Sequence, residues 1–442
     1  MPGLRGVGKT TILLQLYDYL INKKDIDNKD ILFLSMDEVV NYFNTNLLAV
    51  VDNFLTNIHN TTKTYLDKKI FLFVDESHFD KKWAVSGKII YDNSQNIFLL
   101  CTGSSAIDLE INADIARRSF KEYIYPNNFG DYVYLKHKIK TNYSFSKSLE
   151  NQRFSNVGKN GVFSKTLENI IYFGEEKYIN EGIRLEEEIQ DKLYSLKNYP
   201  KSEFNQFLKS YGFPFALELD EEDIYNQTFF LINMVIEKDI PAIKSFNTST
   251  NVNIRRILIY LAMARSELVS TQKIADYLAM SSKTVSEILG VLEKTQIIFN
   301  IKPYGSAGKI VKKPWKYYFL SPTLKSAINY DIGRFNLDSK KCLGTLAENY
   351  VATSLFKLNQ TRFHLMGLFY PPEKKGCDFL LRTKLDDMVP IEVGIGKKTK
   401  SQLTRAINKY DSKYGVLISN GYSNIQRHNN IIHIPLLSFG FL

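Results

Sequence analysis

The sequence contains little of what several protein classes depend on. Its 442 residues include only three cysteines, and these lie far apart, at Cys101, Cys342 and Cys377. A disulfide framework and a cysteine-rich zinc site are therefore excluded, and we expect a protein of the reducing cytoplasm. No uninterrupted apolar stretch approaches the roughly 20 residues that span a bilayer, and the first residues show no signal-peptide pattern. We therefore expect no membrane partner.

Extremes of composition are also absent. Apolar residues make up 44% of the chain and charged residues 24%. These are ordinary values for a globular protein, and they exclude disorder, collagen and coiled coil. At roughly 150 residues per domain, the length predicts about three domains.

Positive charge is in excess, but only in one part of the chain. The net charge of +10 divides into 0 for residues 1–140, −5 for 141–250, +8 for 251–340 and +7 for 341–442. Such an asymmetry indicates contact with a polyanion, and DNA is the partner that we expect. A solubilising surface would give the same distribution, and nucleotide bias alone can also enrich a chain in lysine.

Residues 3–10 read Gly-Leu-Arg-Gly-Val-Gly-Lys-Thr and follow the G-x-x-x-x-G-K-[ST] pattern of a phosphate-binding loop, or Walker A motif. Glycines let successive backbone N–H groups turn inward around an anion, and the run 11–20 predicts a helix whose N-terminus faces the phosphates. The lysine would reach the β- and γ-phosphates, and the threonine hydroxyl would ligate Mg²⁺. We therefore expect ATP and Mg²⁺ as ligands, at a site made of Gly3, Gly6, Gly8, Lys9, Thr10 and Thr11.

A buried strand with two acidic residues at its end follows about 65 residues later. Residues 69–74 are mostly apolar and lead to Asp75 and Glu76, and ligands bind at that end of a parallel sheet. Asp75 would hold Mg²⁺, and Glu76 would polarise the attacking water. A third strand at 97–101 leads to Thr102, whose hydroxyl would sense the γ-phosphate. An acid pair alone is typical of a strand end beside a turn, but the preceding phosphate loop favours a catalytic pair.

Together these segments resemble the prokaryotic AAA+-type P-loop ATPases that carry a C-terminal PD-(D/E)xK nuclease-like domain. The resemblance is in GLRGVGKTT, FLFVDE, the Trp83–Asp92 helix, LLCTGSS, ADIARR and YIYPNNFGDYV, and it covers most of the chain except roughly 136–200. It implies that an arginine shortly after the TGSS segment acts near the nucleotide. Arg118 is the best match and Arg117 the alternative, and either would stabilise transition-state charge. A surface salt bridge is the other interpretation.

One feature departs from the pattern of these ATPases. A phosphate loop normally follows a central buried strand, yet here the loop begins at residue 3, and Met1 and Pro2 are too few to form that strand. We expect a sheet without this strand, and an upstream start, with Met1 an internal methionine. A fragment, or another segment of the chain in the strand's place, would be the alternatives.

The middle of the chain is polar and then acidic, and residues 136–250 predict helices and loops that extend the ATPase without identifiable chemistry. Residues 251–330 predict a winged helix-turn-helix. Helices are expected at 253–265 and 270–278, followed by a third with Val285, Ile288, Leu289 and Leu292 on one face. Two strands joined by a Gly/Lys-rich hairpin, the wing, complete the order. Lys283, Thr284 and the wing lysines would contact DNA, or the whole unit would pack as a lid.

Residues 338–442 resemble the PD-(D/E)xK nuclease core, in which acids on paired strands ligate a divalent metal. The resemblance assigns Glu348, Asp378 and Glu392 as the acids. Alternation along the second strand places position 394 on the same face as Glu392, but that residue is Gly, where these nucleases have lysine. Lys397, or its neighbour Lys398, would have to reach in instead. Without such a lysine the fold would serve as a DNA-binding or oligomerisation module.

The sequence therefore predicts an α/β protein. A P-loop NTPase parallel sheet at 1–135 is followed by a helical extension at 136–250, a winged helix-turn-helix at 251–330 and a restriction-endonuclease-like α/β domain at 338–442. The function that we expect is Mg²⁺-dependent ATP hydrolysis that acts at DNA. The alternatives are a nucleotide-dependent signalling switch that forms homo-oligomers or binds a protein partner, and a metal-dependent DNA nuclease controlled by ATP.

Overall fold

The structure, a computed structural model, describes residues 1–104, 118–139, 161–244, 246, 248–264, 270–361, 366–373, 376–384, 386–395 and 401–442. The chain forms two compact units. The first unit comprises residues 1–125, 234–245 and 294–296, and the second comprises 126–233, 246–293 and 297–442.

The first unit is a three-stranded parallel sheet with helices on both faces. The strands lie in the order β1 (Ile31–Ser35), β2 (Ile70–Asp75) and β3 (Ile97–Cys101), so β2 is central. The predicted parallel strand that ends at Asp75 is thereby confirmed. The helices of this unit are α1 (Lys9–Lys24), α2 (Met36–Asn41), α3 (Leu47–His59), α4 (Trp83–Asn93) and α11 (Ile240–Ile243), with shorter turns η1 (Asn28–Asp30), η2 (Lys63–Tyr65), η3 (Ser77–Phe79) and η7 (Val235–Asp239).

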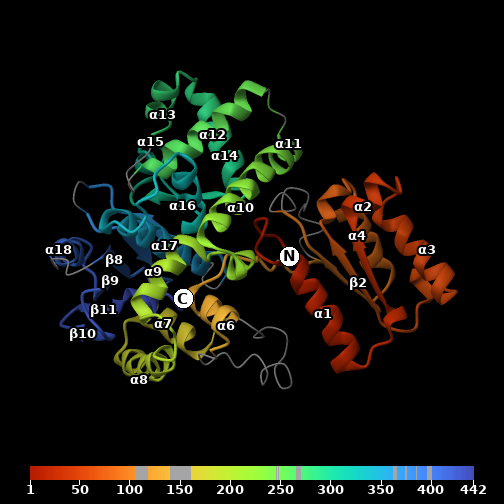
Figure 1. The fold of residues 1–442 in the computed structure, drawn as a ribbon, viewed down its shortest axis with the longest axis horizontal. Coiled ribbons are helices and arrows are strands. Elements are labelled where there is room, and N and C mark those ends of the chain that lie inside the picture. Colours follow the sequence, from red (N-terminus) through yellow and green to blue (C-terminus); the bar gives the residue numbers. More distant parts are fainter. Residues whose placement is uncertain are drawn as a thin grey trace. The chain divides into compact units, whose positions relative to one another are not determined.

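Side chains of β2 alternate between the two faces of this sheet, as the pleat requires. Leu72 and Val74 are buried against the side of the sheet covered by α3 and α4, where Val51 and Leu55 complete the cluster. Phe73 points to the other side and packs with residues of α1. Figure 1 shows α1 on one side of the sheet and α3 on the other. This sandwich fixes the carboxyl end of β2 next to the start of α1.

The edge of β3 carries no strand ahead of the phosphate loop in the described part of the chain. Only two isolated bridges form there, one between Pro2 and Gly103 and one between Gly3 and Ile124. The N-terminal amine of Met1 donates to the carbonyl of Cys101. Among the described residues, the sheet thus has no strand leading into the phosphate loop, as expected, and no strand from elsewhere in them takes that place.

The second unit combines one large mixed sheet with many helices. Its sheet has eight strands in the order β10-β11-β9-β8-β7-β6-β4-β5. The strands are β4 (Ile298–Pro303), β5 (Lys316–Phe319), β6 (Gly367–Tyr370), β7 (Phe379–Arg382), β8 (Met388–Gly394), β9 (Gly415–Ser419), β10 (Gln426–His428) and β11 (Ile431–Pro435).

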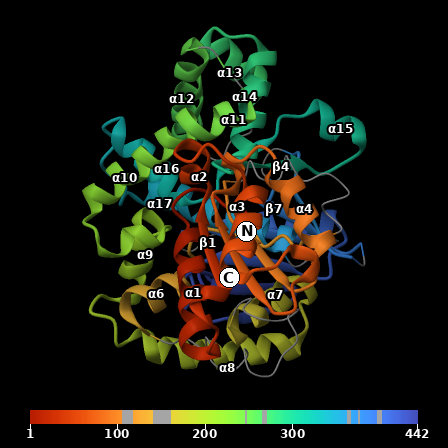
Figure 2. The same cartoon turned by 90° about the vertical axis from the view of Figure 1, so that its right-hand side faces the viewer.

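Helices surround this sheet along the whole second unit. They are α6 (Phe129–His137), α7 (Val162–Phe173), α8 (Glu176–Leu193), α9 (Pro200–Ser210), α10 (Glu221–Met234), α12 (Thr248–Met263), α13 (Thr271–Leu278), α14 (Ser282–Lys294), α15 (Ala307–Lys312), α16 (Pro322–Asp331), α17 (Lys340–Thr361), α18 (Ser401–Lys409) and α19 (Leu436–Phe439), with the turn η6 (Pro214–Glu218). Figures 1 and 2 both show α12, α13 and α14 gathered at one end of this unit.

A helix is present at the position predicted for the third one, as α14, and its expected apolar face is buried at Val285, Ile288, Leu289 and Leu292. The expected wing differs from the prediction in two ways. Its strands β4 and β5 are antiparallel neighbours, but the connection between them contains helix α15 and is more than a hairpin. In addition, β4 pairs in parallel with β6, so both strands extend the C-terminal sheet. Periodicity along a strand does not reveal which distant strand it joins.

The acidic middle of the chain contains two fully buried carboxylates, which its polar composition does not indicate. Glu186 of α8 is 1% exposed and Glu203 of α9 is also 1% exposed. Glu203 accepts hydrogen bonds from the Tyr132 hydroxyl, from Nε2 of His137 at 2.9 Å and from Nδ2 of Asn198 at 2.8 Å. A buried charge is stable only with such partners, so the hydrogen bonds of Glu203 link α9 to α6.

An aromatic cluster joins distant segments of the second unit. The Phe129 ring packs edge-on against Phe204 and Phe441, with centroids 5.1 and 5.6 Å away. The carbonyl of Gly440 accepts hydrogen bonds from the Phe129 N–H at 2.9 Å and from the Tyr350 hydroxyl at 2.6 Å. A Cβ at Gly440 would lie 2.7 Å from the Phe204 ring. The close approach therefore requires glycine.

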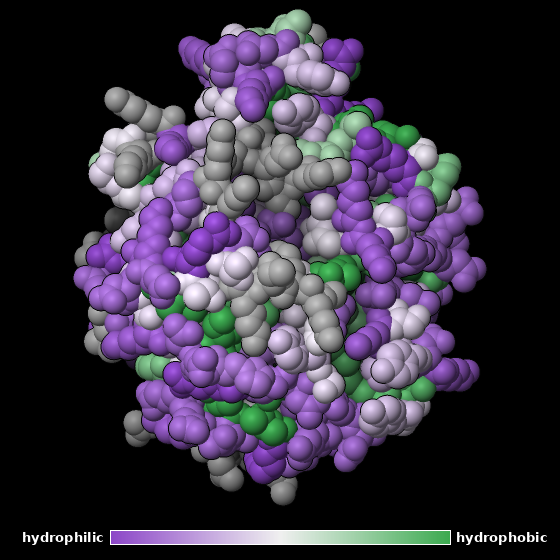
Figure 3. All heavy atoms as spheres, turned by 90° about the vertical axis from the view of Figure 1, so that its left-hand side faces the viewer, coloured by the Kyte–Doolittle hydropathy of each residue, from purple (hydrophilic) through white to green (hydrophobic). Residues whose placement is uncertain are grey.

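The surface in Figure 3 is mainly hydrophilic, and its hydrophobic side chains form several separate patches. The coloured part of this face thus presents no single continuous apolar area. Within the described residues, no helix combines the length and the apolar character that crossing a membrane requires.

Candidate functional site

The loop before α1 is built on glycines that no other residue replaces without strain. Gly6 and Gly8 have φ angles of 79° and 90°, in the left-handed region that favours glycine. A Cβ on Gly3 would lie only 2.6 Å from the carbonyl oxygen of Ile124. Helix α1 begins directly after Gly8, at Lys9. The loop therefore makes a tight turn into the N-terminus of α1. Backbone N–H groups in the first turn of a helix attract anions.

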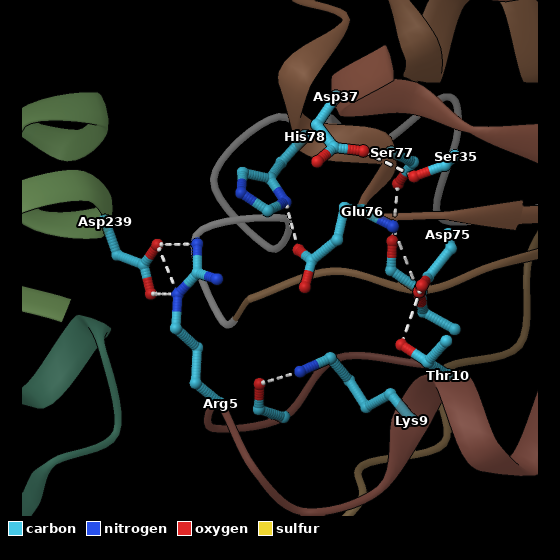
Figure 4. A network of polar contacts seen from close by, with 12 residues as sticks. Arg5, Lys9, Thr10, Ser35, Asp37, Asp75, Glu76, Ser77, His78 and Asp239 are labelled. Atoms are coloured by element: carbon cyan, nitrogen blue, oxygen red, sulfur yellow. Dashed lines mark hydrogen bonds and ion pairs between the residues drawn. The ribbon is translucent and has the colours of Figure 1, made fainter. Parts of the chain in front are cut away.

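Lys9 turns back over this loop. Its side chain is buried, and Nζ donates to the carbonyls of Gly3 at 3.0 Å and Leu4 at 3.2 Å. Burial lowers the pKa of Lys9, and the nearby Glu76 carboxylate partly opposes that shift. The ammonium is thus held at the loop, next to the carboxylates at the end of β2 (Figure 4).

Asp75 joins three of the predicted site segments. The Thr10 hydroxyl donates to Asp75 Oδ2 at 2.7 Å, and the Thr102 hydroxyl donates to the other oxygen, Oδ1. The Thr102 oxygen also accepts the N–H of Glu76 at 3.2 Å. The start of α1, the end of β2 and the residue after β3 therefore meet at one carboxylate. The side chain of Thr11, the neighbouring predicted contact, is exposed on the first turn of α1.

Hard oxygen donors of this kind suit Mg²⁺. The ion is usually bound through one or two carboxylates together with phosphate oxygens, so a complete cage of protein ligands is not needed. Asp75 and Thr10 supply a carboxylate and a hydroxyl at the N-terminus of α1, and this donor set fits the ion. Across the described ranges, no three or more His, Cys, Asp or Glu side chains form a group that could hold a metal by themselves.

Glu76 has an unusual backbone and a buried carboxylate. Its φ of 49° lies in the left-handed region, and the next residue, Ser77, is fixed by its N–H and hydroxyl, which donate to the Thr102 carbonyl at 2.8 and 3.0 Å. Burial raises the pKa of Glu76, although Lys9 and Arg5 oppose the shift. Strained backbone of this type is often concentrated at functional sites. The geometry thus presents a carboxylate with increased proton affinity beside the loop.

His78 lies against this carboxylate. Its Nδ1 is 3.3 Å from Glu76 Oε2, and Figure 4 shows the two side chains pointing toward each other. Burial lowers the pKa of His78 to about 4, so the imidazole is neutral at neutral pH. Neither of these two atoms makes a hydrogen bond within the described part of the chain, so the contact is a close polar approach and not a hydrogen bond.

The site contains one interaction that the sequence does not indicate. Arg5, in the middle of the loop, pairs with Asp239, 234 residues away, and the shortest contact is 2.7 Å between Nη2 and Oδ1. Asp239 ends the π-helical turn η7 and is 2% exposed. The sequence signal that could have suggested a distorted helix there is Pro241, because proline disrupts the hydrogen bonds of the turn before it.

Arg118, the predicted transition-state arginine, lies elsewhere in the first unit. Its Nε donates to Asp92 Oδ1 of α4 at 2.7 Å, and the side chain is 28% exposed. This is the surface salt bridge that the sequence left open as the second interpretation. The alternative, Arg117, lies outside the described residues.

The three acids of the nuclease-like assignment lie around the sheet of the second unit. Tyr318 donates to Glu348 Oε1 at 2.9 Å, and the N–H of Val393 donates to Asp378 Oδ2 at 2.7 Å. Glu392 is buried in β8 opposite Leu417 of β9. Since no metal-holding group forms among the described residues, these acids are not gathered as a three-carboxylate site. Lys397 and Lys398 lie outside the described residues.

The basic residues expected to face DNA are placed only in part. Lys283 lies in the first turn of α14, and in the connection between β4 and β5 Lys313 donates to the carbonyl of Pro372 at 3.3 Å. The ammonium of Lys302 lies 5.0 Å from the centroid of the Trp315 ring.

The fold and the loop together define a class. A three-stranded parallel sheet with a glycine-rich loop leading into a helix, and acids at the end of the central strand, is the pattern of a P-loop NTPase. A family model described as "AAA domain" matches residues 1–133. This match supports membership of the AAA-type P-loop ATPase family and indicates a nucleotide-binding ATPase.

Two further parts of the chain match families without an assigned role. Two models described as domains of unknown function, DUF8612 and DUF4143, match residues 203–336 and 343–439. The chain is also 31% identical over 437 residues to the "Uncharacterized protein MJ1637" of Methanocaldococcus jannaschii. The similarity covers 99% of this chain and 83% of that relative, and the chain belongs to the same family.

Proposed function

We propose that the chain is a Mg²⁺-dependent ATPase whose nucleotide site lies between the loop 3–10 and the end of β2. One observation carries the proposal: Asp75 accepts hydrogen bonds from both Thr10 and Thr102. These hydrogen bonds bring together the start of α1, the end of β2 and the residue after β3, which contain the residues of the proposed site. The match to an AAA domain supports the same assignment.

Each residue has a distinct role in this proposal. The loop N–H groups at Gly6 and Gly8 and the Lys9 ammonium bind the phosphates. Thr10 and Asp75 hold Mg²⁺, which neutralises phosphate charge when bound. Glu76 accepts a proton from the attacking water at its carboxylate, and its burial raises the proton affinity that a base needs.

Two further residues act around this centre. Thr102 fixes Asp75 and the backbone of Glu76 through its hydroxyl. Arg118 supplies transition-state charge, which requires it to leave Asp92. An alanine at Arg118 should then slow hydrolysis, whereas a purely structural salt bridge predicts an unchanged rate.

The decisive experiment separates binding from hydrolysis. Lys9→Ala should weaken ATP binding about 100-fold, because it removes a charged phosphate contact. Glu76→Gln should keep ATP binding and lower turnover by about 10² to 10⁴, the usual contribution of a general base. Lys23→Ala, an exposed lysine in the last turn of α1, is the matched control and should behave as wild type. A Glu76→Gln protein that hydrolyses ATP at the wild-type rate would refute the catalytic assignment.

DNA is the second candidate ligand, favoured by the net charge of +15 on residues 251–442. The DNA role assumes the division proposed from sequence, with a winged helix at 251–330 and a nuclease-like domain at 338–442. Binding of a labelled duplex by the full chain should weaken steeply between 50 and 200 mM salt, roughly 10-fold or more, because phosphate neutralisation releases counterions. Absence of such binding would favour a signalling or oligomerisation switch.

Metal-dependent DNA cleavage is the remaining candidate. Asp378 and Glu392 lie at β7 and β8, which pair as neighbours in the sheet, but position 394 is Gly. Incubation of plasmid DNA with the full chain and Mg²⁺ or Mn²⁺ tests this activity. Cleavage that disappears in Asp378→Ala would support it, and no cleavage by the wild type would exclude it.

A further inference from the structure

Arg5, in the phosphate loop, forms an ion pair with Asp239 that has no role in the ATP hydrolysis proposed for this site. Nε of Arg5 donates to both carboxylate oxygens, at 3.1 and 3.0 Å, and Nη2 donates to Oδ1 at 2.7 Å. Asp239 is nearly fully buried and the Arg5 side chain is 20% exposed. A two-pronged contact of this kind fixes the guanidinium plane as well as its position.

The fixed guanidinium lies next to the proposed catalytic carboxylate. Arg5 is flanked by the loop glycines, and although burial opposes its charge, Asp239 and then Glu76 outweigh that effect and raise the pKa of Arg5. The same electrostatic coupling acts on Glu76, where burial raises the pKa and Lys9 and then Arg5 partly oppose that shift. In Figure 4 the third guanidinium nitrogen, Nη1, points away from Asp239 toward the side on which Glu76 lies.

The helix distortion that presents Asp239 has a local cause. Helix α10 runs to Met234 and continues through the π-helical turn η7 into α11. Pro241 cannot donate a backbone hydrogen bond, and its ring crowds the carbonyl four residues earlier. A wider turn relieves that crowding, and single π-turns are frequent at functional sites. The distortion places Asp239 at the end of the turn, facing the loop.

We propose that Arg5 is a second phosphate-binding cation of the site, selective for the terminal phosphate of a nucleoside triphosphate, and that Asp239 is its positioning residue. The inference rests on the proposed nucleotide site. Lys9 and the loop N–H groups bind the phosphates that ADP and ATP have in common. Arg5 lies beside Glu76, where the water that attacks the terminal phosphate is activated. Its contact is therefore made with ATP and not with ADP.

The test compares two nucleotides on the full chain. Equilibrium binding of the non-hydrolysable analogue adenylyl imidodiphosphate and of ADP, each with Mg²⁺, is measured by calorimetry. Arg5→Gln should weaken the analogue about tenfold, the usual size of one charged hydrogen bond, and change ADP less than twofold. Asp239→Asn should weaken the analogue several-fold, again with ADP nearly unchanged. The quantity that decides is the ratio of the two affinities.

Conservative variants distinguish positioning from bulk charge. Asp239→Glu keeps a carboxylate and should restore much of the ratio. Arg5→Lys keeps the charge but loses the planar, forked guanidinium, so it should not restore the ratio of the two affinities. The control is Asp30→Asn, which removes the exposed ion pair with Lys68 before β1, at the opposite end of the strands. It should leave the ratio at the wild-type value.

The outcomes separate this inference from the function on which it rests. A wild-type protein that binds neither nucleotide overturns both. Wild-type binding, with Asp239→Asn weakening the two nucleotides by the same factor, leaves the nucleotide site intact and shows that the pair only holds the segment in place. Because each variant serves as its own ADP reference, partial loss of folding lowers both affinities and does not imitate the expected change in ratio.

Discussion

Glu186 of α8 accepts a hydrogen bond from the backbone N–H of Ile425, 239 residues later, at 2.6 Å. The hydroxyl of Ser438 donates to its other oxygen. Burial raises the pKa of Glu186 to about 7, although both hydrogen bonds oppose the shift. The folded second unit therefore holds this proton more tightly than the unfolded chain does.

The consequence is a stability that falls with rising pH. A carboxyl whose folded pKa is raised contributes most below its unfolded pKa, and this contribution is lost as pH rises from about 4.5 through 7. We expect the free energy of unfolding of the second unit to decrease by about 3 kcal/mol from this group between pH 4 and 8. Denaturant unfolding of Glu186→Gln should lack this component, and the variant should be more stable than wild type at pH 8. Parallel pH profiles of the two proteins would contradict the assignment.

Glu203 predicts the opposite sign. Burial alone would raise its pKa, but hydrogen bonds from Tyr132, Asn198 and His137 outweigh it and lower the pKa. Its stabilisation is present above the unfolded pKa and is lost when the pH falls through the folded pKa. Glu203→Gln places an amide against these donors and should destabilise the second unit by about 3 kcal/mol at pH 7.

The control for Glu203 is another glutamate on the same helical extension. Glu188 forms an exposed i,i+4 pair with Arg184, and its change to Gln should cost no more than about 0.5 kcal/mol. Similar losses in the two variants, measured by denaturant unfolding, would show that burial of Glu203 contributes nothing.

Thr102 tests the connection between the third strand and the catalytic acids. Thr102→Val removes the hydroxyl that donates to Asp75 and accepts from the Glu76 N–H. We expect ATP turnover to fall about 10- to 100-fold, while ADP affinity changes less than about threefold, because the loop contacts remain. Ser104→Ala is the comparison. If it has the larger effect, Ser104 and not Thr102 is the sensing hydroxyl.

A pair of glycine substitutions tests the loop geometry. Gly3→Ala would place Cβ 2.6 Å from the Ile124 carbonyl, so the loop must shift and nucleotide affinity should fall about tenfold or more. Gly290→Ala in α14 meets nothing within 4 Å and should raise the thermal midpoint slightly, since alanine favours helix by about 0.5 to 1 kcal/mol. Unchanged ATP binding in Gly3→Ala would mean that the loop tolerates the side chain.

Local sequence patterns predicted the phosphate loop and the acidic residues at the end of a buried strand. The loop and the acids after β2 follow from residue types at fixed spacing, and the parallel sheet then brings them together. Arg5 and Asp239 could not be paired from sequence, because an ion pair has no periodicity and any of many acids could meet one arginine. The burial of Glu186 was hidden for a similar reason. It precedes two further glutamates, and composition does not tell which of three acids points inward.

In the C-terminal half, the pairing of distant strands also could not be predicted from the sequence. The paired strands expected at Asp378 and Glu392 are present as β7 and β8. The sequence did not reveal that β4 joins β6, because strand partners are chosen by packing across the whole sheet. The predicted carboxylates of this half were assigned by resemblance, and the described residues do not group them as a metal site.

The hydrogen bond from the Phe129 N–H to the Gly440 carbonyl also constrains how the protein is made. Synthesis proceeds from the N-terminus at roughly 5–20 residues per second. Helix α6 must therefore wait roughly 15 to 60 seconds before the ribosome has added the partner that caps its first turn. Until then the Phe129 and Phe204 side chains lack Phe441 and Gly440. The second unit therefore completes this part of its core only after residues 440 and 441 have been synthesised.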